Sequence, residues 1–367
     1  MSAHDFNPLL DIPVFPASGF APLADRLKRI FATGNDLLFI QAEALLALEA
    51  AASSLGRPGL VAVNVVTSPY GTYFGAWLRR AGADVVDVVA PSGQPVATEA
   101  VAQAIEMLGH VDLVAIVHAE AANGALNPLE EVAALARAAG ALLVVDAVAS
   151  AGGHAVDIEG LGIDIAVLGP QKALGGPVGL SLVTVSDRAW AAMQSVPRFS
   201  PSLLSLLDIK EAWLDRGRGA LPGTPPPLEF HALAAAVDRL EAEGLAARIT
   251  RHQRAAKASR AGLRALGVEP WVADDDRASA LVTAAPVPDG VDASALIDAA
   301  AAFGVALGRG FGDIEHRLVR LDHTGGRAAF GPVLANVTAY GAALAALGQV
   351  VDIGAGAAAV TAVYGEA

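Results

Sequence analysis

The sequence predicts an α/β protein in which a mainly parallel sheet carries helices on both faces and a smaller α+β domain follows. Between residues 59 and 185, short runs rich in β-branched residues alternate with helical stretches. Alternation at this spacing is typical of right-handed crossovers between parallel strands. The chain of 367 residues is also too long for one small core, which favours one large domain with a smaller partner.

The first half of the chain supplies the expected sheet and its covering helices. We expect strands at residues 60–66, 84–89, 111–117, 141–146, 164–168 and 179–185. Helices are expected between them at residues 72–81, 98–108 and 128–139. In sheets of this kind, ligands bind beyond the carboxyl ends of the strands. Functional residues are therefore expected at those ends.

The second half begins with a stiff break, the PGTPPP run at residues 222–227. A long helix rich in Ala, Arg and Glu is expected at residues 228–266, and it would bridge to a second domain that starts near Gly267. That domain is expected to hold strands at 278–284 and 317–321, helices at 292–302 and 330–347, and a small apolar tail at 349–367. The predicted division is a large domain at residues 16–235 and a smaller domain made of residues 236–367 together with residues 1–15.

The composition limits the partners of the protein. A net charge of -13 without a basic cluster argues against nucleic acid. No run of about 18 apolar residues is free of charges and breakers, and residues 1–10 lack the pattern of a secretory signal. The absence of cysteine excludes disulfides and thiolate metal ligands and favours a cytoplasmic location. We therefore expect small-molecule substrates, no membrane partner and no bound metal.

Two residues near the carboxyl ends of expected strands carry the strongest chemical signal. Asp146 closes an apolar strand, and Lys172 lies in the turn GPQKALGG. Singly, such an acid is commonly a turn cap and such a lysine is commonly solvated. Together they indicate more, because a lysine that condenses with an aldehyde must lose its proton, which burial promotes. A buried carboxylate also keeps a pyridine nitrogen protonated, so that the ring accepts electrons.

This segment resembles the Schiff-base segment of the class V aminotransferases, which are fold-type I enzymes that use vitamin B6. The family pattern D-A-V-S-S-x-G-G, then G-x-x-K-x-L-G-G-x-P-G-L, is matched at Asp146, Lys172, Gly175, Gly176 and Gly179. The resemblance implies that Lys172 forms the Schiff base and that Asp146 pairs with the pyridine nitrogen. It also implies a homodimer or a homotetramer.

Further stretches resemble the cofactor contacts of the family. The run SPYG at residues 68–71 places Tyr70 where the family has an aromatic side chain that stacks on the pyridine ring. The run HAEAANG at residues 118–124 resembles H-x-E-T-S-T-G without its hydroxyl groups, so a contact to the ring oxygen is either lost or supplied by Asn123. Thr224 matches a threonine that reaches the cofactor phosphate, often across a dimer interface. The resemblance also implies vitamer contacts by Ala44, Val148 and Gln171.

Two arginines are candidates for binding the substrate carboxylate. Arg320 begins RLDHTG, which resembles the family pattern R-x-G-H-x-G, where the arginine holds that carboxylate. Arg309, in the turn Gly-Arg-Gly at residues 308–310, is expected to be a second contact. The planar guanidinium suits a bidentate carboxylate contact that lysine cannot reproduce.

One turn departs from the family pattern. The cofactor phosphate normally rests on a turn rich in glycine and hydroxyl groups before the helix A-L-E-A-A, here residues 47–51, where the helix N-terminus favours an anion. In this chain the turn reads IQAEAL, with Glu43 in it. An ionised Glu43 about 4 Å from a phosphate dianion costs about 8 kcal/mol at an effective dielectric constant of about 20. We expect Glu43 to accept a hydrogen bond from the hydroxymethyl group of an unphosphorylated vitamer; alternatively, it only caps its helix.

This departure resembles the branch of the family that acts on free pyridoxamine. The predicted reaction exchanges the amino group between pyridoxamine and a small 2-oxo acid, pyruvate, to give pyridoxal and L-alanine, a step of vitamin B6 degradation. The vitamer would then be a substrate that is bound covalently to Lys172. The first alternative is a conventional transaminase of the alanine–glyoxylate or serine–pyruvate type, with pyridoxal 5'-phosphate as cofactor. The second is a non-catalytic vitamer-binding protein, and a lyase or racemase also stays open.

Overall fold

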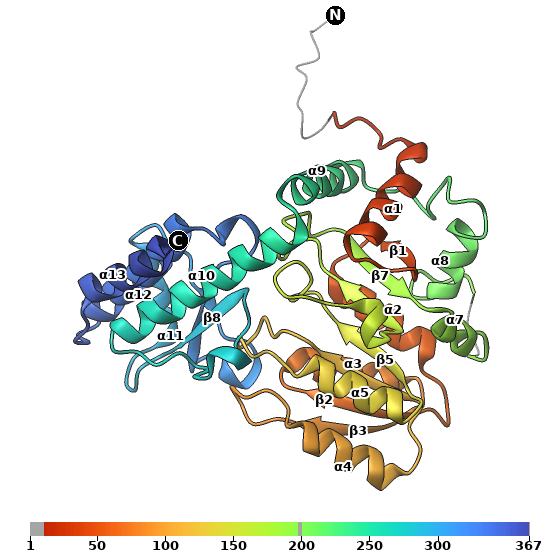
Figure 1. The fold of residues 1–367 in the computed structure, drawn as a ribbon, viewed down its shortest axis with the longest axis horizontal. Coiled ribbons are helices and arrows are strands. Elements are labelled where there is room, and N and C mark those ends of the chain that lie inside the picture. Colours follow the sequence, from red (N-terminus) through yellow and green to blue (C-terminus); the bar gives the residue numbers. More distant parts are fainter. Residues whose placement is uncertain (1–10, 197–199, 367) are drawn as a thin grey trace, which may run out of the picture.

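The computed structural model describes residues 11–196 and 200–366. In these ranges, a seven-stranded sheet of order β1-β7-β6-β5-β4-β2-β3 forms the centre of the larger part of the molecule (Figure 1). Neighbouring strands are parallel from β3 to β6. Strand β7 runs antiparallel to both β1 and β6. The prediction of a mainly parallel sheet is therefore confirmed, although the sequence did not predict the direction of β7.

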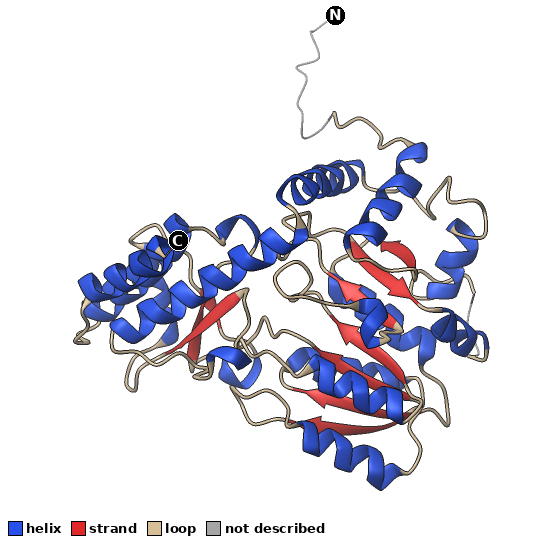
Figure 2. Cartoon of the chain, viewed as in Figure 1, coloured by secondary structure: helices blue, strands red, loops and turns tan. Residues whose placement is uncertain are grey.

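Strands and helices alternate along this part of the chain, and helices flank the sheet (Figure 2). The strands are β1 (Asp36–Ile40), β2 (Val61–Val66), β3 (Asp84–Val89), β4 (Leu113–Val117), β5 (Leu142–Asp146), β6 (Ile165–Leu168) and β7 (Ser181–Val185). The helices are α1 (Phe20–Ile30), α2 (Ala44–Leu55), α3 (Pro69–Arg80), α4 (Thr98–Leu108), α5 (Leu129–Ala138), α6 (Ile158–Leu161), α7 (Asp187–Gln194), α8 (Leu206–Trp213) and α9 (Pro227–Glu243). Sequence analysis did not predict β1, α1, α6, α7 and α8.

The central strands are buried on both faces. Every residue of β4 is buried, and so are the residues of β5 after Leu142. A strand covered by helices on both sides loses the alternation of polar and apolar residues, which explains why these strands read as continuous apolar runs. An acid that ends such a strand, as Asp146 does, is therefore carried to the edge of a fully apolar core.

The smaller part of the molecule has a core of its own around an antiparallel sheet of order β8-β10-β9. The strands are β8 (Val282–Pro286), β9 (Gly308–Arg309) and β10 (Leu318–Asp322), and the helices are α11 (Ala293–Ala301), α12 (Phe330–Ala346) and α13 (Ile353–Gly365). Helix α13 occupies the tail to which the sequence assigned no role, and it packs against α10 (Leu245–Ala265) and α12. Short 3-10 turns are η1 (Ala17–Gly19), η2 (Asp275–Arg277), η3 (Gly312–Ile314) and η4 (Gly325–Arg327).

The single long helix predicted at residues 228–266 is wrong. The segment forms α9 and α10, which are separated at Gly244. Gly244 has φ 81° and ψ 140°, and a helix cannot continue through that conformation, which glycine adopts at little cost. After this break α10 runs from the larger part to the smaller part (Figure 1).

The predicted domain boundary between residues 235 and 236 falls within α9 and stays a prediction. The assignment of residues 1–15 to the smaller domain lies mostly outside the described residues, as does the expectation about a secretory signal. No helix in the described ranges is long and apolar enough to cross a membrane.

We expect Gly244→Ala to destabilise the protein by about 1–3 kcal/mol, because an alanine at φ 81° is strained. No described atom lies within 4 Å of the added Cβ, so strain and not a clash is the cause. Denaturant unfolding measures the change. Gly331→Ala, an exposed position in the first turn of α12 with comparable space, should instead be neutral or slightly stabilising. Equal effects of the two changes would contradict the backbone explanation.

Candidate active site

A cavity opens where the loops after the parallel strands meet the smaller part of the molecule. Its inner region, about 390 Å³, is lined by residues that follow β1, β2, β4, β5 and β6, including Glu43, Tyr70, Asp146 and Lys172. An outer region of about 880 Å³ shares Lys172 with it and is completed by Arg320 and other residues of the smaller part. The structure therefore brings together eight of the eleven site residues selected from sequence, namely Glu43, Ala44, Tyr70, Asp146, Val148, Gln171, Lys172 and Arg320.

Asp146 lies at the carboxyl end of β5 and is almost fully buried. Its Oδ1 accepts a hydrogen bond from the backbone N–H of Val148, at 2.9 Å. Burial raises the pKa of Asp146 to about 6, against the lowering effects of this hydrogen bond and of the Lys172 charge. A cationic partner would restore the charged form, because an opposite charge nearby favours ionisation. A protonated pyridine nitrogen is such a partner.

Lys172 lies in a tight turn after β6. The turn is closed by hydrogen bonds from Lys172 N–H to Gly169 O, at 3.1 Å, and from Gly175 N–H to Lys172 O, at 3.0 Å. Gly175 has φ 70°, a conformation that favours glycine. Burial lowers the pKa of the Lys172 amine, and the neighbouring carboxylates only partly offset this effect. A larger share of the amine is therefore neutral and nucleophilic than for a solvated lysine.

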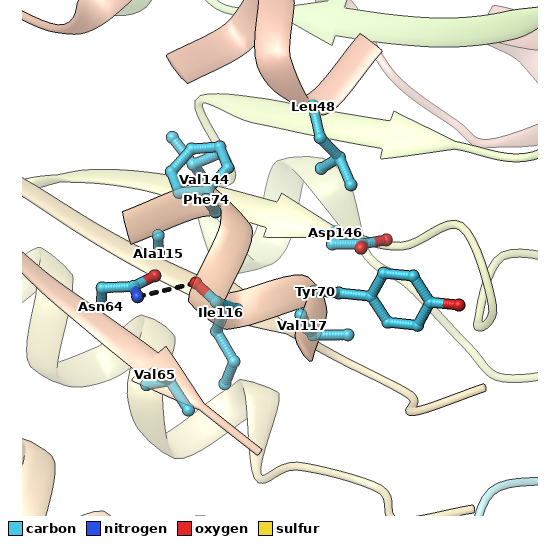
Figure 3. A pocket seen from close by; sticks show the side chains of 11 residues that line it. Leu48, Asn64, Val65, Tyr70, Phe74, Ala115, Ile116, Val117, Val144 and Asp146 are labelled. Atoms are coloured by element: carbon cyan, nitrogen blue, oxygen red, sulfur yellow. Dashed lines mark hydrogen bonds between the residues drawn. The ribbon is translucent and has the colours of Figure 1, made fainter. Parts of the chain in front are cut away.

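Tyr70 enters the cavity from the first turn of α3. Figure 3 shows its ring and the Asp146 carboxylate projecting next to each other, and both line the same pocket. Ser68 caps the helix by accepting a hydrogen bond from Tyr70 N–H, at 3.2 Å. A Cβ at Gly71 would lie 2.5 Å from Val65 O, so the glycine of the SPYG run lets α3 approach β2. The Tyr70 ring also stacks on Phe311, with 5.8 Å between the ring centroids.

Glu43 has two partners at the start of α2. Its Oε2 accepts a hydrogen bond from Leu45 N–H, at 2.9 Å, and thereby caps the helix. Its Oε1 lies 3.4 Å from Nε2 of Gln171, which precedes Lys172. Ala44, Leu45 and Glu43 all line the inner cavity. The carboxylate thus occupies the helix N-terminus, where an external anion would otherwise bind.

Arg320 comes from β10 and is held in a fixed orientation. Its Nε donates to Arg309 O and its Nη1 donates to Ala121 O, both at 2.8 Å. Arg320 pairs with Gly308 across the sheet, and a Cβ at Gly308 would lie 3.1 Å from Arg320 Nε. The glycine therefore leaves room for the guanidinium at the cavity.

Arg309 is not brought into the cavity. It pairs with Val319, one residue away from the pair of Gly308 and Arg320, and side chains alternate between the two faces of a sheet. Arg309 accordingly points away from Arg320, and its Nη2 donates to the Ser294 hydroxyl at 2.7 Å. The sequence pattern Gly-Arg-Gly did not reveal this register.

Asn123 and Thr224 also lie apart from the residues that line the cavity. The buried amide of Asn123 donates to Thr67 O and accepts from Ala125 N–H, both at 2.9 Å, so it ties its own turn to the segment after β2. Thr224 is exposed. Val148 and Gln171, by contrast, line the cavity where the sequence analysis expected them.

Several residues of the site were missed by sequence reasoning. Asp322 and Arg327 line the outer cavity beside Lys172, and Phe311 covers Tyr70. Glu120 is fully buried, accepts a hydrogen bond from the Thr67 hydroxyl, and has its pKa raised by burial to about 7. Asp322 and Glu120 lie within motifs that the sequence analysis had recognised, so their positions could have marked them as site residues. The contact of Phe311 with Tyr70 depends on how the two parts of the molecule meet.

Three buried histidines, His118, His252 and His323, and the partly buried His154 support the walls of the site. His154 Nε2 accepts a hydrogen bond from Ala280 N–H at 2.8 Å, and His252 Nε2 accepts one from Gly325 N–H at 2.9 Å. Burial lowers the pKa of His118 and His323 to about 3 and that of His154 and His252 to about 4. Among the described residues, no group of three or more His, Asp or Glu side chains could hold a metal ion.

Comparison with known proteins identifies the family. The family model for class V aminotransferases matches residues 31–320. The chain belongs to the class V aminotransferase family. Its fold is the fold-type I aminotransferase fold, as the sequence predicted, and enzymes of this family depend on pyridoxal 5'-phosphate.

Relatives with named activities are similar over almost the whole chain. The pyridoxamine–pyruvate transaminase of Mesorhizobium japonicum is 37% identical over 96% of this chain and 88% of its own length. The crystal structure of pyridoxamine–pyruvate aminotransferase from Mesorhizobium loti superposes with a TM-score of 0.90, at 34% identity, over 99% of this chain and 91% of that chain. The ureidoglycine–glyoxylate aminotransferase of Bacillus subtilis gives a TM-score of 0.88 at 25% identity, covering 97% of this chain and 93% of that one.

We expect the protein to lose stability on acidification from pH 7 to pH 5. These four histidines bind protons in the unfolded chain below about pH 6.5 but not in the folded protein, so acid favours unfolding. Glu120 and Asp146, with raised pKa values of about 7 and about 6, act in the opposite direction but are fewer. The net excess of about two protons on the unfolded chain corresponds to a loss on the order of 2–3 kcal/mol per pH unit near pH 5.5.

Denaturant unfolding at several pH values measures this slope. His323→Gln removes one of the four histidines and should reduce the slope by about one proton. Substitution of the exposed His316 by Gln should leave the slope as it is. A free energy of unfolding that rises on acidification would rule out this assignment of protonation states.

Proposed function

We propose that the protein exchanges an amino group between free pyridoxamine and a small 2-oxo acid such as pyruvate, giving pyridoxal and L-alanine. One observation carries the proposal: the Glu43 carboxylate occupies the N-terminus of α2 at the wall of the cavity that contains Lys172 and Asp146. The similarity to the pyridoxamine–pyruvate transaminase of Mesorhizobium japonicum supports the same substrates.

The residues present fit the ring of the vitamer. Asp146 offers a buried carboxylate for the pyridine nitrogen, and Tyr70 offers an aromatic face beside it. When bound, the vitamer supplies a protonated pyridine ring that takes up the electrons left as a proton departs from carbon. The role of Asp146 is to keep that proton on the ring nitrogen.

The phosphate of pyridoxal 5'-phosphate fits this chain less well. Leu45 N–H and the Gln171 amide could donate hydrogen bonds to an anion, but both already contact the Glu43 carboxylate. A phosphate placed there would meet a like charge at short range. A hydroxymethyl group is neutral and can donate a hydrogen bond to the carboxylate. Glu43 therefore serves both as a helix cap and as the residue that selects the free vitamer.

Lys172 is the acid–base residue of the proposal. Burial lowers the pKa of its amine, so Nζ can take a proton from the carbon next to the transferred nitrogen and return it on the other side of the exchange. Nζ also forms the covalent link to pyridoxal between turnovers. Arg320 orients the acceptor: its fixed guanidinium retains N–H groups beyond the two that bind Arg309 O and Ala121 O, and these bind the carboxylate of the 2-oxo acid.

We also propose that the chain assembles as a homodimer or homotetramer in the cytoplasm. Thr224 is exposed and does not line the cavity of its own chain, which agrees with a contact made across a subunit interface. The proposal assigns no carboxylate contact to Arg309 and no ring contact to Asn123, because both side chains have other partners.

A conventional transaminase with pyridoxal 5'-phosphate as cofactor is the second candidate. The similarity to ureidoglycine–glyoxylate aminotransferase of Bacillus subtilis favours it. Both candidates use Lys172, Asp146 and Arg320 in the same roles. They differ in the meaning of Glu43, so vitamer preference separates them.

Lys172→Ala should reduce the transfer of the amino group from pyridoxamine to pyruvate by about 10³-fold or more, because no other amine replaces Nζ as base. Formation of pyridoxal measures the rate. Borohydride reduction of wild-type protein with pyridoxal should attach the vitamer to the peptide that contains Lys172. Lys257→Ala removes an exposed lysine paired with Glu366 and should leave both results unchanged. Substantial turnover by Lys172→Ala would refute the assignment.

The wild-type protein should bind pyridoxal more tightly than pyridoxal 5'-phosphate. Glu43→Ser should change the ratio of the two dissociation constants by about tenfold or more in favour of the phosphate form. Serine retains the helix cap and removes the charge, so folding is preserved. Titration of the absorbance band of the bound vitamer gives both dissociation constants. Glu49→Gln removes a charge from the same helix outside the cavity and serves as the control. Tighter binding of the phosphate form by the wild type would favour the conventional transaminase.

A further inference from the structure

Among the residues that line the outer cavity, Asp322 is acidic, whereas Lys172, Arg320 and Arg327 are basic. Asp322 lies two residues after Arg320 on β10 and therefore faces the same side of the sheet. Its cross-strand partner is Val282, and that of Arg320 is Gly308; both partners line the outer cavity with Lys172. The intervening Leu321 is buried in the core of the smaller part. The register thus directs the Asp322 carboxylate toward the space in which the amino acceptor would lie.

This carboxylate is held in place. It accepts hydrogen bonds from the backbone N–H of Thr324, at 2.9 Å, and from the Thr324 hydroxyl. Arg327 Nη1 approaches its other oxygen at 3.2 Å. A turn cap alone explains the Thr324 contacts but does not require a place on the cavity wall. In addition, the pattern R-x-G-H-x-G, which this segment resembles, has glycine at position 322, so the carboxylate is a feature of this chain.

The charges around Lys172 are unbalanced. Carboxylates of Asp322, Asp146 and Glu43 act on the amine, and the guanidinium of Arg320 acts against them. Among the charged groups Asp322 has the largest effect on Lys172. A 2-oxo acid that places its first carboxylate on Arg320 would bring a second carboxylate next to Asp322. The guanidinium of Arg327 is already paired with that Asp322 carboxylate, at 3.2 Å. Like charges brought together in a recognition site disfavour the wrong partner strongly.

We infer that Asp322 is a specificity-determining residue that restricts the amino acceptor to 2-oxo acids with a single carboxylate and disfavours those with a second carboxylate in the side chain. The inference rests on the proposed function and names the acceptor class of the same site. Pyruvate meets the requirement, whereas 2-oxoglutarate does not. Arg320 positions the carboxylate that all 2-oxo acids have in common. Asp322 disfavours acceptors whose side chain carries a second carboxylate.

The test compares kcat/KM for pyruvate and for 2-oxoglutarate, with pyridoxamine as amino donor. Wild-type protein should prefer pyruvate, and Asp322→Asn should raise the ratio of 2-oxoglutarate to pyruvate by about tenfold or more. Asparagine retains an oxygen that accepts from Thr324 N–H, so the turn is preserved. If the Asp322→Asn variant does not fold, Asp322→Gly is the second variant to measure. Asp289→Asn makes the same charge change at an exposed position away from the cavity, and its ratio should equal that of the wild type.

A binding measurement keeps the inference separate from the proposed function. Propionate and succinate are unreactive acids with one and two carboxylates, and thermal shift titration compares their affinities for the protein without turnover. Asp322→Asn should strengthen succinate binding relative to propionate. An unchanged ratio in a folded Asp322→Asn variant, or a wild-type preference for the dicarboxylate, would overturn the inference. Absence of amino transfer from pyridoxamine, with the binding ratio shifted as expected, would reject the proposed function and retain Asp322 as the selective residue.

Discussion

Removal of water from one amine and one carboxyl group is the constraint on which the site depends. For both Lys172 and Asp146, burial has a larger effect on the pKa than the attraction between the two groups. The apolar strands β4 and β5 create this condition, since they place Asp146 at the edge of a core from which water is excluded. The same burial that weakens the charged forms makes the amine a usable base and leaves the carboxyl group in need of a cationic partner.

The two parts of the molecule contribute different functions to one cavity. The larger part supplies the groups that face a vitamer ring, and the smaller part supplies the groups that face an acceptor acid. Arg320 links them, because it belongs to β10 and donates to Ala121 O of the larger part. His154 and His252 fix the neighbouring segments by accepting hydrogen bonds from backbone N–H groups at 2.8 Å and 2.9 Å. A shift of one part against the other would therefore disturb the acceptor site.

Local motifs made much of the fold and part of the site predictable. Asp146 and Lys172 each lie within a continuous pattern, and the apolar runs that precede them are long enough to mark strands β5 and β6. The position of Arg309 was not predictable, since it depends on the pairing of β9 with β10, and a shift of one residue reverses the face. Gly244 was missed because a glycine inside a helical pattern is often tolerated, and only its backbone angles mark the break.

The roles of Asn123 and Phe311 needed the structure for another reason. Asn123 lies in a motif of the site, yet its amide is already bound to Ala125 in its own turn and to Thr67 after β2. Phe311 belongs to no motif, and its stacking on Tyr70 arises from the approach of two segments 241 positions apart. Sequence patterns record which residues are present, whereas the competition between neighbouring partners decides what each side chain has left to offer.

The double duty of Glu43 has an evolutionary consequence. A helix N-cap is a position that serine, threonine, aspartate or asparagine also fills, so the stability of α2 does not depend on a glutamate there. Descendants of a common ancestor could therefore exchange a charged cap for a hydroxyl cap without passing through an unfolded intermediate. Under the proposed function, the preference for one vitamer can therefore change by substitution at position 43 almost independently of the fold. An ordinary cofactor site and a catabolic site are then separated by few mutational steps.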